Sequence, residues 1–140
     1  MKKKQLLFLL ILIFIISISL TYSFFYIYKI QEVNTIDVTV EFKNSDSISF
    51  ITDTDALRFG KISLQGVATR EINLANNKDY DMLVKIKDYG ETKEWLTYSN
   101  NDFLLKPKQN KNISFTIFAP NEEQYIGNHT GKVKIFFLRP

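Results

Sequence analysis

The heptapeptide IDVTVEF at residues 36–42 decides the fold class of this chain of 140 residues. Its four apolar residues alternate with three polar ones. A period of two places all four apolar side chains on one face of a β-strand and the polar side chains on the other. A strand with one buried and one wet face is typical of an antiparallel sheet that covers a core.

The same alternation returns along the rest of the chain, with clusters of turn residues such as Asn44-Ser45-Asp46 in between. The clearest repeats lie at 82–86 and at 113–117, where Phe115 is central on the apolar face. The shorter strand candidates are residues 48–50, 57–59, 72–74, 95–98, 103–105 and 133–137. Eight or nine strands in about 105 residues predict an all-β fold, an immunoglobulin-like antiparallel β-sandwich.

A long apolar segment precedes the strands. Residues 5–28 carry no charge, and Lys2, Lys3 and Lys4 stand directly before them. As a helix this segment spans roughly 36 Å, which is enough to cross a hydrocarbon core of about 30 Å. The basic triplet predicts a cytoplasmic N-terminus by the positive-inside rule. We therefore expect four parts: a basic cytoplasmic N-terminus (1–4), a transmembrane signal anchor (5–28), a short linker (29–34) and an extracytoplasmic sandwich (35–140).

Two other interpretations of the apolar segment stay open. A cleavable signal peptide would have the same basic start, and Ser17-Ile18-Ser19 offers small residues for a cleavage site. Against cleavage, the apolar character continues for nine residues beyond Ser19. A pilin-type signal is disfavoured because the Lys-Lys-Lys-Gln start lacks the small residue usual at that cleavage point.

Charge and cysteine content exclude several classes of function. The formal charge is +3, but three of the 18 basic residues form the N-terminal triplet and all 15 acidic residues lie at or beyond Glu32. The remaining chain is formally neutral, so we expect no nucleic-acid binding, which needs a basic surface. The absence of cysteine excludes disulfides, thiolate metal sites and a cysteine nucleophile. We expect no cofactor.

Several short motifs carry a family resemblance. They are Leu57-Arg58-Phe59-Gly60, Gly66, the run from Arg70 to Asn76, Trp95, Lys106-Pro107, and Tyr125-Ile126-Gly127. This pattern resembles the immunoglobulin-like domains of the abnormal-spindle/Hydin and major-sperm-protein group, in particular membrane-anchored cell-surface versions such as those of archaea. It covers roughly residues 36–138 and departs at Gln109-Asn110, where a glycine is usual. The resemblance implies a binding or architectural module without catalytic residues.

Structural roles are expected for most of the conspicuous single residues. The five glycines are expected between strands, where a turn needs positive φ or close packing. Trp95 is expected in the core. Tyr125, shortly before Gly127, is a candidate tyrosine corner whose hydroxyl satisfies a buried backbone group.

Candidate chemical residues are few. His129 is the only histidine, and residues 127–131 are expected to form a hairpin tip in which it is a solvated loop residue. The pairs Asp53/Asp55 and Asp79/Asp81 have a spacing found in calcium loops, although aspartate also caps turns. Glu122-Glu123 is expected to be a charged loop. No residue is assigned a catalytic, cofactor-binding or metal-binding role.

Two sequons are candidate N-glycosylation sites: Asn112, before Ile113-Ser114, and Asn128, before His129-Thr130. Asn128 is expected in an accessible loop flanked by glycines, whereas Asn112 begins a strand.

We expect a single-pass protein of the cell membrane whose extracytoplasmic domain is a non-catalytic interaction or structural module, with another envelope or surface protein as partner. The alternative is a stator-like accessory subunit of a cell-surface filament or secretion machine. A third hypothesis, an enzyme or a metal-dependent carbohydrate-binding domain, would need exposed aromatic residues beside Asp53 and Asp55.

Overall fold

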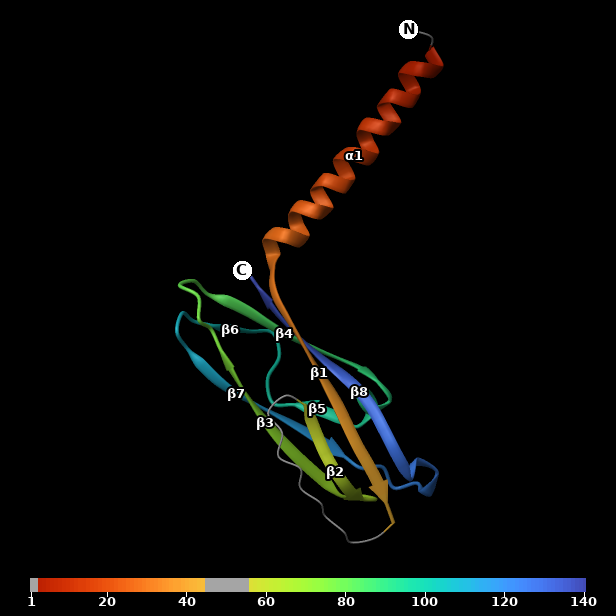
Figure 1. Cartoon of the computed structure of the whole chain (residues 1–140), viewed down its shortest axis with the longest axis vertical. Helices are drawn as coiled ribbons and strands as arrows, with labels where there is room; N and C mark the ends of the chain where they lie inside the picture. Colours follow the sequence, from red (N-terminus) through yellow and green to blue (C-terminus); the bar gives the residue numbers. More distant parts are fainter. Residues whose placement is uncertain (1–2, 45–55) are drawn as a thin grey trace.

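Residues 3–44 and 56–140 are described by a computed structural model (Figure 1). They form one N-terminal helix followed by two β-sheets packed as a sandwich. The expected all-β domain behind a single helix is confirmed. The strand candidate at 48–50 and the pair Asp53/Asp55 lie outside the described residues.

Helix α1 spans Lys3–Lys29 and carries no buried residue. It is long and apolar enough to cross a membrane. Its run of Leu, Ile and Phe contains neither glycine nor proline, so nothing interrupts the backbone hydrogen bonds. The segment expected at 5–28 lies inside this helix.

The short linker expected at residues 29–34 is wrong. Strand β1 (Ile30–Lys43) begins at the residue after the helix. Its first residues pair with the end of β8 (Gly127–Leu138), with Ile30 opposite Leu138 and Asn34 opposite Ile135. The polar composition of residues 31–35 suggested a linker, but the neighbouring strand satisfies their backbone groups and makes them part of the sheet.

The sandwich has a larger and a smaller sheet. The larger sheet has the order β2-β1-β8-β4-β6, with β2 at Leu57–Ser63, β4 at Met82–Gly90 and β6 at Phe103–Leu105. The smaller sheet has the order β3-β7-β5, with β3 at Val67–Ala75, β7 at Asn110–Phe118 and β5 at Leu96–Tyr98. Two 3₁₀ helices, η1 (Glu91–Glu94) and η2 (Glu123–Tyr125), lie in the connections.

The sandwich departs from the expected antiparallel pattern at one place, because β1 and β2 pair in parallel. Alternating polarity indicates that a segment is a strand but not its direction. The register shifts between Thr39 and Val40, where Gly60 adopts a φ of 71°. A glycine tolerates this conformation without strain, so Gly60 lies within a bulged strand and not between strands as expected.

The core lies between the two sheets and confirms the predicted strand faces. Ile113, Phe115 and Ile117 of β7 are completely buried. The other buried apolar residues come from both sheets and the connections: Val38, Val40, Phe42, Leu57, Phe59, Ile62, Leu74, Met82, Val84, Ile86, Leu96, Leu105, Ala119, Val133, Ile135 and Phe137.

Gly131 also lies within a strand, paired with Val38 on one side and Gly90 on the other. A Cβ atom at Gly131 would collide with the hydroxyl of Thr92 and approach the carbonyl oxygen of Tyr89 to 2.8 Å. The glycine is therefore required because η1 packs directly against β8.

Candidate functional site

A group of connected polar and aromatic side chains lies where the helix meets the sandwich. This joint consists of Tyr28, Lys29, Gln31, Tyr80 and Arg139. The backbone N–H of Arg139 donates to the carbonyl of Lys29 at 2.9 Å. The guanidinium carbon of Arg139 lies 5.1 Å from the ring centroid of Tyr28 and 4.8 Å from that of Tyr80. Arg139 thus links the last helical turn to the sandwich through two cation–π contacts.

Gln31 completes the joint with two side-chain hydrogen bonds. Its Nε2 donates to the carbonyl of Tyr28 at 2.7 Å, and its Oε1 accepts from the hydroxyl of Tyr80 at 3.0 Å. Together with the direct passage of α1 into β1, these bonds restrict swivelling of the helix relative to the sandwich.

Asn76 fixes the loop that carries Tyr80. Its side chain is 1% exposed, and its Nδ2 donates to the carbonyls of Tyr80 and Leu105 at 2.8 and 2.9 Å. Its Oδ1 accepts from the N–H of Lys78 at 2.9 Å. A buried amide with these partners joins two loops at the helix end of the sandwich. Sequence reasoning placed Asn76 in a turn but did not identify this role or that of Arg139.

His129 is not the solvated residue of a hairpin tip. Residues 127–131 are part of β8 because their backbone pairs with 38–42 of β1. The side chain of His129 is 16% exposed and lies among aromatic rings, 4.9 Å from Trp95 and 5.2 Å from Phe42 between centroids. The glycines at 127 and 131 suggested a loop, but long-range pairing with β1 extends the strand across them.

Both ring nitrogens of His129 have partners. Nε2 lies 2.7 Å from the carbonyl oxygen of Tyr125 and Nδ1 lies 3.2 Å from Oε2 of Glu91. A carbonyl only accepts, so Nε2 carries a proton; a protonated ring also donates to the Glu91 carboxylate. A histidine held in this way ties η1 and η2 to β8.

Trp95 and Tyr125 belong to the same aromatic cluster. Trp95 makes edge contacts with Phe42 at 5.1 Å and with Tyr125 at 5.2 Å between ring centroids, so its expected packing role is confirmed. Tyr125 meets His129 through its backbone carbonyl and not through its hydroxyl. The cluster is favoured by edge-to-face geometry and closes the end of the sandwich away from the helix.

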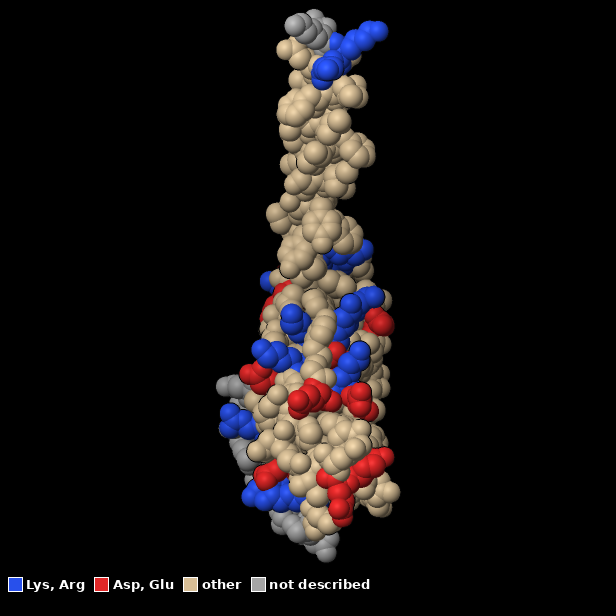
Figure 2. Space-filling view, turned by 90° about the vertical axis from the view of Figure 1, so that its right-hand side faces the viewer, with Lys and Arg blue, Asp and Glu red and all other residues tan. Residues whose placement is uncertain are grey.

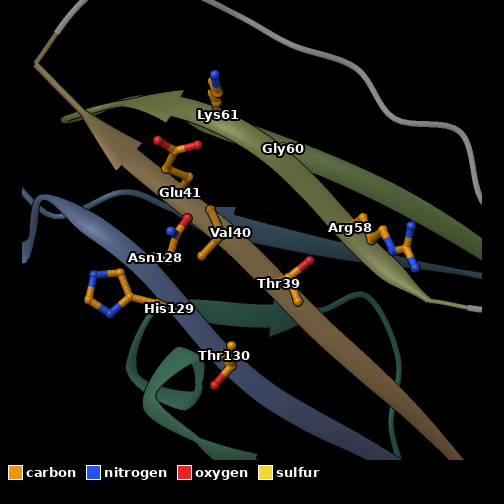
Figure 3. Close-up of a pocket in the computed structure, with 9 residues that line it drawn as sticks. All are labelled: Thr39, Val40, Glu41, Arg58, Gly60, Lys61, Asn128, His129 and Thr130. Carbon is orange, nitrogen blue, oxygen red and sulfur yellow. The ribbon is translucent and has the colours of Figure 1, made fainter.

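A shallow hollow of about 340 Å³ lies on the outside of the larger sheet, over β2, β1 and β8 (Figure 3). Glu41 and Asn128 lie close to each other on neighbouring strands, and Thr39 and Arg58 lie farther along. Glu41 also pairs with Lys43 at 3.1 Å, which raises the pKa of Lys43 through hydrogen bonding and charge attraction. Most side chains that line the hollow are polar. Among them, no nucleophile lies in contact with a base.

The acidic candidates do not come together. Asp79 pairs with Lys108 at 3.1 Å, and both Asp79 and Asp81 are exposed. Glu122 and Glu123 are exposed, and Glu123 accepts a long hydrogen bond of 3.5 Å from Asn44. In residues 3–44 and 56–140, no three carboxylate or histidine side chains are grouped as metal ligands.

The two sequon asparagines are both exposed but in different surroundings. Asn128 lies at the start of β8 beside the hollow, in a strand and not in the expected loop. Asn112 lies within β7, and its Oδ1 accepts from Nδ2 of Asn73 at 2.6 Å on the neighbouring strand. Asn128 therefore offers the freer amide.

Tyr98, which lies outside the aromatic cluster, has a raised pKa. Tyr98 lies half-buried beside Phe115, and its hydroxyl is 3.5 Å from the carbonyl of Ile86. Burial raises the pKa of Tyr98, and the nearby Asp88 carboxylate raises it further. This group is a packing residue with a weak hydrogen bond.

Comparison with protein-family models, with curated proteins and with solved structures gives no match for this chain. The resemblance to the abnormal-spindle/Hydin and major-sperm-protein group therefore stays a prediction. The chain's own geometry carries the functional argument.

Proposed function

We propose that this chain is a single-pass, membrane-anchored extracytoplasmic protein whose β-sandwich is an interaction or structural module without catalytic activity. The observation that carries the proposal is the passage of α1 directly into β1, a strand that pairs on both sides within the larger sheet. An anchor built into a central strand holds the domain at a fixed place beside the bilayer. The basic triplet before the apolar residues 5–28 supports a cytoplasmic N-terminus.

The contacts of the chemically capable residues support a non-catalytic role. His129 has a partner at each ring nitrogen within the fold, and the acidic residues of the described ranges are not grouped in threes as metal ligands. General acid–base catalysis needs a positioned group within reach of a substrate. The sandwich offers strand edges and flat faces instead, which suit recognition through backbone and surface contacts.

The edge of β3 that is not paired with β7, and that no other strand of the described residues covers, is the proposed place for a partner strand. β3 is a nine-residue edge strand of the smaller sheet, whereas the opposite edge strand, β5, has three residues. A partner that adds a strand needs a long row of free backbone groups and few special side chains. The partner is then another envelope protein with an extended segment.

Photo-crosslinking in native membranes tests this proposal. A photoreactive residue replaces Glu71 on β3 in the full-length chain, and the matched control carries it at Glu94 on η1. We expect one defined envelope protein to crosslink at Glu71 only, and the adduct to weaken when residues 30–140 are secreted without the helix. Equal adducts at both positions, or adducts that do not depend on the helix, would contradict the proposal.

A stator-like subunit of a surface machine is a second candidate, and the rigid joint favours it because a part that bears load needs a stiff connection. Inserting a flexible Gly-Ser linker after Lys29 should abolish the machine's activity while the protein stays in the membrane. The control is the same insertion in the exposed loop between Asn121 and Glu122. Tolerance of the insertion after Lys29 would exclude a load-bearing role and leave the interaction module.

A further inference from the structure

The outer face of the larger sheet is not uniformly polar, as the wet face of a sandwich usually is. At its helix end the face carries five apolar side chains: Val33, Leu83, Leu104, Phe136 and Leu138. They are neighbours across the strands, with Val33 opposite Phe136 and Leu83 opposite both Leu104 and Leu138. Val33 and Leu104 are 39% and 54% exposed. This is a contiguous apolar patch beside the base of the helix.

Lysines follow the apolar patch on the same face. Lys85 and Lys87 project from β4, and Lys132 and Lys134 project from β8. Lys87 lies directly opposite Lys134 in the register of the two strands. Like charges in this position destabilise strand pairing, so the arrangement does not serve the stability of the isolated domain.

Nearby acids neutralise only part of this charge. Lys85 pairs with the exposed Asp102 at 3.1 Å, and Lys132 lies 3.9 Å from Asp37. Lys134 lies 5.5 Å from the ring centroid of Tyr89, an exposed aromatic residue at the far end of the lysine group. The face therefore combines an apolar patch with neighbouring basic side chains, as membrane-surface segments do.

The position of the helix brings this face toward the bilayer. In Figure 1, α1 and the strands do not form a straight line, and the bend opens on the side of β8 and β4. Figure 2 turns that side to the viewer and shows Lys and Arg gathered near the base of the helix, with Asp and Glu more frequent farther from it. The joint formed by Arg139, Gln31 and Tyr80 holds this bend.

We propose that the outer face of β4 and β8 is a membrane-contact surface that lies against anionic lipid headgroups next to the point where α1 enters the bilayer. The apolar patch meets the boundary of the acyl chains, and the lysines behind it meet headgroup phosphates and carboxylates. The inference rests on the proposed function in one respect, because it takes α1 as the membrane anchor.

Fluorescence quenching by labelled lipids tests this proposal. The full-length chain carries a fluorophore and is inserted into nanodiscs. The chain contains no cysteine, so a single cysteine carries a fluorophore at one defined position. Thr35 of β1, exposed directly beside the proposed surface and opposite Lys134 of β8, is the test position; Thr97, exposed on the smaller sheet, is the control. Nanodiscs contain phosphatidylcholine with or without phosphatidylglycerol, and a headgroup nitroxide lipid quenches the fluorophore.

With phosphatidylglycerol we expect quenching at Thr35 to exceed that at Thr97 by about twofold or more, and the excess to shrink at high salt. Replacing Lys85, Lys87 and Lys134 together by Gln should remove the part of the quenching that depends on phosphatidylglycerol. The matched triple of Lys43, Lys61 and Lys93 to Gln should keep it. Thermal melting of both triples verifies that the fold is intact.

Equal quenching at Thr35 and Thr97 would overturn the membrane-contact surface and leave the face free for an acidic protein. An equal loss in both lysine triples would overturn it too, since the attraction would then be a property of net charge. A chain that does not insert into nanodiscs at all contradicts the anchor itself, which is a separate and recognisable failure.

Discussion

Phe115 tests the buried face of β7 at the scale of a single residue. It is completely buried between Ile113 and Ile117 on its strand. Truncation to Ala removes most of an aromatic side chain and leaves a cavity, so Phe115→Ala should lower the free energy of unfolding by about 3 to 5 kcal/mol. Urea unfolding of residues 30–140 measures this loss. A loss within about 0.5 kcal/mol, as for an ordinary surface substitution, would contradict the assigned face.

Asn76 tests the polar connection at the helix end. Asn76→Ala removes a buried amide and leaves the carbonyls of Tyr80 and Leu105 without their donor. Unsatisfied buried acceptors are costly, so we expect a loss of about 2 to 4 kcal/mol in the same measurement. The neighbouring exposed Asn77→Ala is the control and should change stability by about 0.5 kcal/mol or less. Equal effects at the two positions would refute the cross-linking role.

The raised pKa of Tyr98 predicts that the stability of the fold depends on pH in the alkaline range. Its pKa is raised in the folded state by burial and by Asp88, so the folded chain holds this proton more tightly than the unfolded chain. The corresponding stability is present below the unfolded pKa of about 10 and is lost as the pH rises through the folded pKa. Tyr98→Phe should therefore show a shallower fall in melting temperature above about pH 10 than the parent chain. An identical slope would contradict the shift.

At the scale of elements, the first half of β1 can be tested to decide whether residues 30–35 form a strand or a linker. Residues 30–35 pair with the end of β8 and protect the backbone of that strand. A domain that begins at Ile36 should therefore unfold at lower urea concentration than one that begins at Ile30, and should lose amide exchange protection at 134–138. The same stability for both domains would restore the linker interpretation.

The elements that the sequence predicts well are those with local periodicity. Alternation identified the buried faces of β1, β4 and β7 because each strand has one wet face and one dry face. Three features depend on distant partners and carry no local signal: the pairing of residues 30–34, the parallel direction of β2, and the inclusion of His129 in β8. The joint could not be predicted from the sequence for the same reason, because Arg139 contacts Tyr28 and Tyr80 only in the folded chain.

At the scale of the whole molecule, the helix and the sandwich form one continuous unit. Lys3 and Lys4, the apolar part of the helix, the joint and the face with its apolar patch and lysines follow one another in space (Figures 1 and 2). Each element has a consistent place if α1 crosses the bilayer and the sandwich lies on the outer side. The central claim is therefore the topology of the chain.

Protease accessibility of terminal tags measures that topology directly. One version of the full-length chain carries a tag after Pro140 and another carries it before Met1, and intact cells or spheroplasts are treated with protease. We predict that the tag after Pro140 is digested and the tag before Met1 is protected, with residues 5–28 retained in the mature mass. Protection of the tag after Pro140 with digestion of the other, or a mature chain that begins after Ser19, would contradict the account.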